Sequence, residues 1–319
     1  MLGRHRKSLL QAFNLLQEVT LDPKDRRPTA YRLQELLRSR TMRCERSIRK
    51  AKERRKALRF RLCQRDMPLS KADAASVKID IRNTDALIDN LQRLIRIYRE
   101  IGDAIAFTHI DSFDLKPFAF KQDHGFISGK RGSRREIKIF RQCRNALKPD
   151  FIMILNDLTN CLRYADLTIA AFGKVVGLLE VKSQRKKRLD QRENRQQEVG
   201  SNLLKYVITD ETDTLYGLKG MFKRMSAHSM IKDRTNKLNE LLQKSRNSND
   251  ICELVEPGLA YAVFRRGDFS IELMSKILPK NKTSKWMFNL INSQKHLNDG
   301  HYPFPLLIRS PEDLYNFYN

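Results

Sequence analysis

Two carboxylates and a lysine stand at a spacing that suits phosphodiester hydrolysis. Asp166 is followed, after thirteen intervening residues, by Glu180, and Lys182 comes two residues later. Carboxylate oxygens with open water positions suit Mg²⁺ or Mn²⁺. A lysine beside them would position an attacking water and offset charge on the phosphate. These residue types therefore indicate metal-dependent hydrolysis of a phosphodiester.

The segment that carries these residues predicts a β-hairpin. Residues 162–184 read LRYADLTIAAFGKVVGLLEVKSQ, two alternating runs joined by a Gly-containing turn at 172–174. Residues opposite one another then have numbers that sum to 346, which sets Asp166 across from Glu180. Gln184 shares the strand face of Glu180 and Lys182. This register needs an odd-numbered loop or a bulge, because a two-residue turn at 173–174 moves the acids to opposite faces.

Helices are expected on both sides of the hairpin. Residues 134–147 have a helical pattern in which Glu136, Phe140, Cys143 and Leu147 share one face, so the Glu136 side chain is expected to point inward. Residues 185–206 read as a polar, basic helix that follows the second strand. Helices in these positions would flank the hairpin and hold the acids.

The pattern Asp166, then Glu180-Val181-Lys182 at the end of an apolar strand, resembles the signature of the PD-(D/E)XK nuclease superfamily. The resemblance covers roughly residues 101–210, with a later strand around 258–264 as an optional part. It implies an α/β fold with a mixed sheet flanked by helices in the order αβββαβ. It also implies that Mg²⁺ or Mn²⁺ is held by Asp166, Glu180 and Glu136, and that Lys182 and Gln184 complete the catalytic group.

The chain departs from that family pattern before the first acid. Ala165 precedes Asp166, and the literal Pro-Asp pair is Pro149-Asp150. Asp150 and Asp157 therefore stay as rivals of Asp166 for the first metal-binding position.

A basic helical hairpin is predicted ahead of this region. Two helical patterns fill 31–106, with a break at 64–69 and a capping signal at Ser70 and Asp73. Residues at alternating steps of three and four form the seam of an antiparallel hairpin. The seam residues are Leu37, Cys44, Ile48, Ala51, Leu58 and Leu62 in the first helix and Ala74, Val77, Ile81, Thr84, Ile88, Leu91, Ile95 and Tyr98 in the second. Ten Lys and Arg stand against two acids between Arg43 and Arg61, which favours a surface that binds phosphates. A solvated helix face is the alternative interpretation. The expected nucleic-acid-binding residues are Arg43, Arg46, Arg49, Lys50, Arg54, Arg55 and Lys56, with Arg185, Lys186 and Lys187 beside the acids.

The composition excludes several classes of protein. The chain has 319 residues and a formal net charge of +25, which points to a polyanionic partner. No apolar run is long enough for a membrane span or a signal peptide, so we expect a soluble cytoplasmic protein with no membrane partner. Five widely spaced cysteines and six scattered histidines do not form a zinc motif.

Together these patterns predict two regions: a basic helical hairpin within 1–106 and a nuclease-like α/β region with a C-terminal extension over 107–319. The expected function is metal-dependent endonucleolytic cleavage of DNA, by analogy in restriction or anti-phage defence. The helical seam favours a homodimer, and the toxicity of an unregulated nuclease favours an activating protein partner. The alternative is a non-catalytic nucleic-acid-binding or scaffold protein. The sequence leaves open whether the polymer is DNA or RNA, and whether cleavage is sequence-specific.

Overall fold

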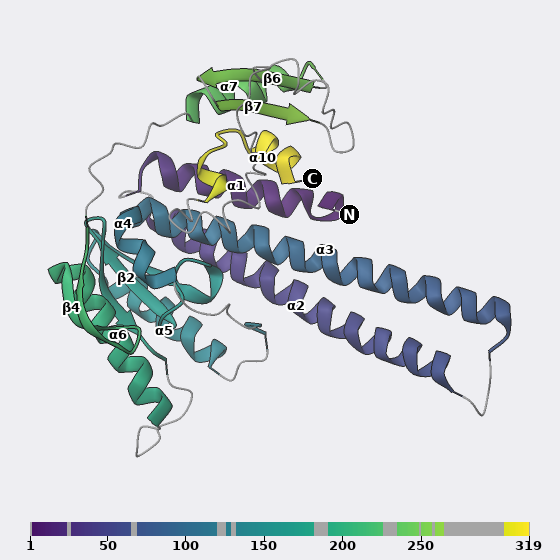
Figure 1. Cartoon of the computed structure of the whole chain (residues 1–319), viewed down its shortest axis with the longest axis horizontal. Helices are drawn as coiled ribbons and strands as arrows, with labels where there is room; N and C mark the ends of the chain where they lie inside the picture. Colours follow the sequence, from purple (N-terminus) through teal and green to yellow (C-terminus); the bar gives the residue numbers. More distant parts are fainter. Residues whose placement is uncertain are drawn as a thin grey trace. The chain divides into compact units, whose positions relative to one another are not determined.

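The computed structural model describes residues 2–23, 27–64, 69–119, 126–128, 132–181, 191–225, 235–248, 250–256, 259–264 and 303–318. Its contacts divide the chain into two compact units, Met1–Arg224 and Met225–Asn319. The fold is mixed α/β, as the sequence predicts at that level, with a long helical region at the N-terminus and small antiparallel sheets (Figure 1).

The first unit contains most of the described secondary structure. Its helices are η1 (Leu2–His5), α1 (Arg6–Leu21), α2 (Arg27–Cys63), α3 (Lys71–His109), α4 (Ser112–Leu115), η2 (Lys116–Ala119), α5 (Ser133–Ala146), η3 (Asn156–Leu158) and α6 (Gln191–Thr209). Its strands are β1 (Phe151–Leu155), β2 (Leu167–Ala171), β3 (Lys174–Leu179), β4 (Glu211–Leu215) and β5 (Leu218–Lys223).

Helices α2 and α3 form the predicted helical hairpin, called the arm below, and run side by side over most of their lengths (Figure 1). The Ser70 hydroxyl accepts a hydrogen bond from the Asp73 N–H at 3.0 Å, which confirms the predicted start of α3. The predicted seam is buried at Cys44, Ile48, Ala51, Val77, Thr84, Ile88, Leu91, Ile95 and Tyr98. Among its described residues α2 has no buried side chain after Ala51, so the far part of the arm exposes mostly charged surface.

Strands β1, β2 and β3 form an antiparallel sheet in which β2 is central and β1 is an edge. The two-residue turn of the β2–β3 hairpin is Phe172-Gly173, and both residues have positive φ (51° and 78°), as a type I′ turn requires. Most of β2 is buried on both faces, whereas Lys174 and Val176 of β3 are exposed. The predicted acids lie at the end of these strands, beyond the last ladder pair.

Helix α2 covers the free edge of β1 with polar side chains. The Gln34 amide donates to the Met153 carbonyl at 3.0 Å and accepts from the Leu155 N–H at 2.8 Å. Arg27 donates to the Phe151 carbonyl at 3.1 Å. These contacts replace the partners that another strand would supply, because a buried backbone polar group without a partner is costly.

The sequence-based boundary at residue 106 differs from the division that the contacts show. The helical region and the sheet belong to one unit that ends at Arg224. The physical reason is that α2 and α3 share polar contacts with the sheet end. For example, the fully buried Asp103 accepts hydrogen bonds from the N–H groups of Asn160, at 2.5 Å, and Cys161, at 2.9 Å.

The second unit is built from α7 (Thr235–Ser245), β6 (Asp250–Glu256), β7 (Leu259–Phe264), η4 (Phe304–Leu306) and α10 (Pro311–Tyr318). Strands β6 and β7 pair antiparallel. Arg246 binds Asp313 through two hydrogen bonds of 2.8 and 2.6 Å, and Asn239 bonds the backbone of Leu307 and Arg309. No helix in the described ranges has the length and hydropathy needed to cross a bilayer.

Candidate active site at the end of the sheet

Asp166 and Glu180 come together at one end of the β2–β3 hairpin. The ladder pairs Leu167 with Leu179 and Ile169 with Gly177, which is the predicted register. The two-residue turn alone would give a register shifted by one, and a bulge between Ile169 and Ala170 restores it. The predicted register, with the bulge that it needs, is therefore confirmed up to Leu167 and Leu179, the last ladder pair before the two acids.

A kinked backbone then aims Asp166 at the segment after β3. The Asp166 N–H donates to the Leu179 carbonyl at 3.1 Å, and Asp166 Oδ2 accepts from the Val181 N–H at 2.7 Å. Ala165 has a φ of 66°, a left-handed conformation that a proline ring forbids. Proline at position 165 would therefore be incompatible with this backbone.

Asn156 holds this kink in place. The buried Asn156 side chain donates to the carbonyl of Tyr164 at 2.6 Å and to that of Ala165 at 3.3 Å. Its backbone N–H donates to the Asp166 carbonyl at 3.0 Å. Asn156 directly follows β1, so the end of β1 fixes the direction in which the chain enters β2 through Asp166.

Glu136 reaches the same end of the sheet from the first turn of α5. It is buried, as predicted, with 7% of its surface exposed. A Cβ built on Gly132 would lie 2.9 Å from Glu136 Oε1 and 3.9 Å from the Val181 carbonyl oxygen. The Glu136 carboxylate and the residue after Glu180 therefore both approach Gly132, and the missing side chain there leaves room for the carboxylate.

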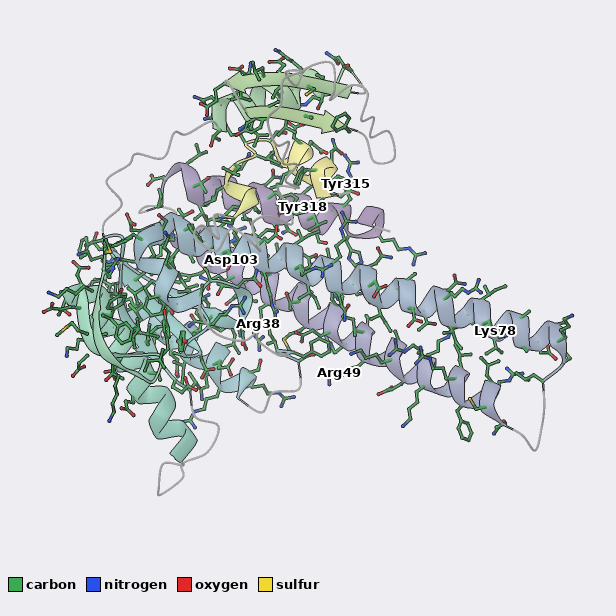
Figure 2. All side chains as sticks on the ribbon, viewed as in Figure 1. Arg38, Arg49, Lys78, Asp103, Tyr315 and Tyr318 are labelled. Atoms are coloured by element: carbon green, nitrogen blue, oxygen red, sulfur yellow. The ribbon has the colours of Figure 1, made fainter. Side chains whose placement is uncertain are left out.

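Arg38 brings a positive charge to these acids from α2. Its guanidinium donates to the Ser133 carbonyl at 3.0 Å and to the Ser133 hydroxyl at 2.8 Å. Burial lowers the pKa of Arg38, and the negative charges of Glu136 and Asp157 act in the opposite direction. The group remains a cation because an arginine does not lose its proton at ordinary pH. Figure 2 shows Arg38 on the part of α2 near the sheet.

The two rivals of Asp166 lie in different places. Asp150 precedes β1 and lines a cavity of about 320 Å³ with Phe172 and Gly173, at the opposite end of the sheet. A five-residue strand separates the two ends by roughly 16 Å. Asp157 is buried on η3, at the same end as Asp166, so Asp157 remains a rival and Asp150 is separated from the other acids.

Several predicted residues lie outside the described residues, namely Lys182, Gln184, Arg185, Lys186 and Lys187. The described part of the predicted helix that follows is α6, which begins at Gln191. Within the described ranges, no three His, Cys, Asp or Glu side chains have the arrangement of a formed metal site. Asp166, Glu180 and Glu136, all within those ranges, lie at one end of the sheet, but they do not form a three-ligand metal site there.

The predicted basic surface of the arm has two kinds of cation. Arg49 donates to Ser128, Arg54 pairs with Asp80 at 3.4 Å, and Arg55 pairs with Asp85 at 2.7 Å. In contrast, Arg43, Arg46, Lys50 and Lys56 are exposed and make no ion pair within the described residues. This second group is the one available to a phosphate backbone.

Sequence reasoning missed a stripe of polar side chains along α2. Its members contact the backbone of the α/β part and are Arg27, Gln34, Arg38, Glu45 and Arg49. The buried Glu45 carboxylate accepts from the N–H groups of Ile127, at 2.9 Å, and Ser128, at 2.5 Å. Steps of seven, four, seven and four residues put them on one helix face, and this spacing was the available signal.

Comparison of the chain with protein-family models, with curated proteins and with solved structures finds no significant match. The residues and their geometry therefore carry the functional argument.

Proposed function

We propose that the protein is a metal-dependent nuclease that hydrolyses phosphodiester bonds at the end of the β2–β3 hairpin. The observation that carries the proposal is that Asp166, Glu180 and Glu136 lie at the same end of the sheet, near Val181. Asp166 Oδ2 binds the Val181 N–H at 2.7 Å, Glu180 precedes Val181, and Glu136 Oε1 approaches the same point as the Val181 carbonyl. A divalent cation would compensate the negative charges of carboxylates in these positions.

The order of elements around these acids supports the proposal. The chain runs α5, β1, β2, β3 and α6, which matches the first five elements of the αβββαβ order that the sequence resemblance implies, whereas β4 pairs with β5 in a separate two-stranded sheet. The first acid precedes β2 and the second follows β3, on adjacent antiparallel strands. This order supports a restriction-endonuclease-like core as the finer description of the fold.

The carboxylates suit a hard divalent cation. Asp166, Glu180 and Glu136 would hold Mg²⁺ or Mn²⁺, and Asp157 is the rival donor for the first position. The bound ion would polarise the phosphate and lower the pKa of a water molecule. Glu180 is exposed and Asp166 half-buried, so a large substrate can reach these groups. Lys182, outside the described residues, is assigned from the sequence to orient the attacking water.

The charge of the chain supports a nucleic acid as the substrate. The net charge of +25 and the exposed cations of the arm suit a backbone that carries one negative charge per phosphate. DNA is the proposed polymer.

A second function has one observation in its favour. The described carboxylates do not close into a three-ligand group, and Arg38 already compensates Glu136 and Asp157. A chain that only binds nucleic acid, with the arm as a scaffold, would need no metal. The two functions differ in whether the acids are required for bond cleavage.

The deciding experiment is incubation of the purified chain with plasmid DNA in Mg²⁺ or Mn²⁺, and with EDTA, beside the Glu180→Ala variant. Cleavage that requires both the metal and Glu180 supports the nuclease. Tight, salt-sensitive binding without cleavage under all these conditions supports the scaffold protein. A parallel incubation with single-stranded RNA tests the choice of polymer.

A further inference from the structure

A basic groove runs between α2 and α5, beside the candidate active site. Its volume is about 370 Å³, and its charged lining residues are Arg38, Arg46 and Arg141 with Glu35. The other lining residues are uncharged. Three arginines against one glutamate give the groove a positive charge.

The single acid of the groove is already engaged. Glu35 Oε1 accepts hydrogen bonds from Arg141 at 3.0 Å and from Arg144 at 2.9 Å. These two ion pairs are part-exposed, so each contributes little to stability. Arg141 lines the groove while it is paired with Glu35. Arg46 is exposed and its only described hydrogen bond goes to the Met42 carbonyl, one turn earlier on α2. The groove therefore keeps cationic groups that an anion can reach.

Arg38 connects the groove to the acids. It lines the groove, donates to Ser133 at the start of α5, and lies close enough to Glu136 for their charges to interact. The exposed face of α5 continues the positive surface with Arg134, Arg135 and Lys138. A polyanion that follows this surface passes the first turn of α5, where Glu136 points to the sheet end.

We propose that the groove between α2 and α5 is a subsite for a backbone phosphate of a polynucleotide, contacted by Arg46 and Arg141 at the rim and Arg38 at the base. An arginine fork matches the oxygens of a phosphate and keeps its charge when part-buried. The groove is open rather than enclosed, which suits one phosphate of a long chain better than a free small anion. The inference rests on the proposed function for the identity of the polymer.

The test uses the full chain and a short fluorescein-labelled DNA duplex, with EDTA present so that binding is measured without metal-dependent cleavage. Fluorescence anisotropy gives Kd for the Arg46→Gln, Arg141→Gln double variant over about 50 to 300 mM salt. The matched control is Lys205→Gln with Lys219→Gln, which removes the same charge from α6 and β5. Far-UV circular dichroism and thermal unfolding check that each variant is folded.

The groove variant is expected to bind about tenfold more weakly at moderate salt and to lose about 0.9 from the magnitude of the salt slope, since one phosphate contact is lost. Equal Kd and slope in the groove and control variants would overturn the subsite. The outcome is separate from that of the nuclease. A chain that never cleaves but shows the groove effect keeps the subsite, whereas a cleaving chain without the effect loses only the subsite.

Discussion

The carboxylate of Asp166 accepts a hydrogen bond from the backbone N–H of Val181, which ties the start of β2 to the residue after Glu180. This contact fixes the position of one oxygen of the Asp166 carboxylate. A Cβ on Gly132 would lie close to both Glu136 Oε1 and the Val181 carbonyl oxygen, so Glu136 lies at the same end of the sheet.

Replacing Asp166 by Asn should abolish cleavage while leaving the fold intact. The Asn oxygen can still accept from the Val181 N–H, but the amide removes the negative charge that a divalent cation needs. We expect loss of plasmid cleavage by at least about a hundredfold with little change in duplex binding. Asp213→Asn, an exposed site on β4 that pairs with Lys205, is the control. Full activity in the Asp166 variant would transfer the role to Asp157.

Replacing Gly132 by Ala should reduce cleavage without a large loss of stability. The new Cβ would lie 2.9 Å from Glu136 Oε1, so the flexible end of the glutamate must move away. The backbone of Gly132 has a φ of −70°, which alanine adopts readily. Cleavage rates and thermal unfolding of the same preparation separate the two effects. A variant with unchanged activity would mean that the position of the Glu136 carboxylate is unimportant.

The strained residue before Asp166 gives a prediction of stability. Ala165 occupies the left-handed region, where glycine has no steric cost, so Ala165→Gly should stabilise the fold by about 1 kcal/mol or leave it unchanged. Ala165→Pro, which restores a literal Pro-Asp pair, should destabilise it because the ring forbids this φ. Urea unfolding midpoints measure both changes. A more stable proline variant would show that the kink is absent in solution.

The arm is expected to bind nucleic acid through its unpaired cations. Arg43 and Lys50 are seven residues apart on α2, so they lie on one flank, and neither makes an ion pair within the described residues. Neutralising both with Gln should weaken duplex binding and lower the magnitude of the salt slope by about 2. Lys219→Gln with Lys223→Gln on β5 serves as the comparison. If the arm variant keeps the wild-type slope, the arm contacts a protein instead.

The helical arm and the hairpin register were predictable because each is encoded locally. The seam of α2 and α3 repeats over many turns, and the alternation in residues 162–184 fixes which strand face is apolar. The bulge was foreseen only as one option. The bulge is needed because the turn is Phe172-Gly173. This turn places a phenylalanine in a left-handed conformation, where Asn, Asp or Gly is usual.

The supports of the site were less predictable because they join residues far apart in the chain. Gln34 bonds the backbone of β1 more than a hundred residues later, and its spacing from the other polar residues of α2 indicates a shared helix face but not the partner. Asn156 acts similarly on the kink at Ala165. The partners of such polar residues can be identified only in the assembled fold, because they are backbone groups far away in the chain. Apolar periodicity, in contrast, can be read within each helix or strand alone.

Acid should destabilise the fold through His109, near the end of α3. Its Nε2 is buried without a hydrogen-bond partner in the described part of the chain, and burial lowers the pKa of the imidazole from 6.5 to about 4. Below about pH 6.5 the unfolded chain therefore takes up a proton that the folded chain does not, and stability falls until the folded pKa is reached. Between about pH 7.5 and 5 the loss should be on the order of 2 kcal/mol. Urea unfolding at both pH values measures it, and His109→Leu should remove most of the difference. An equal loss in the variant would assign the acid sensitivity to other groups, such as His5, whose pKa is also lowered by burial.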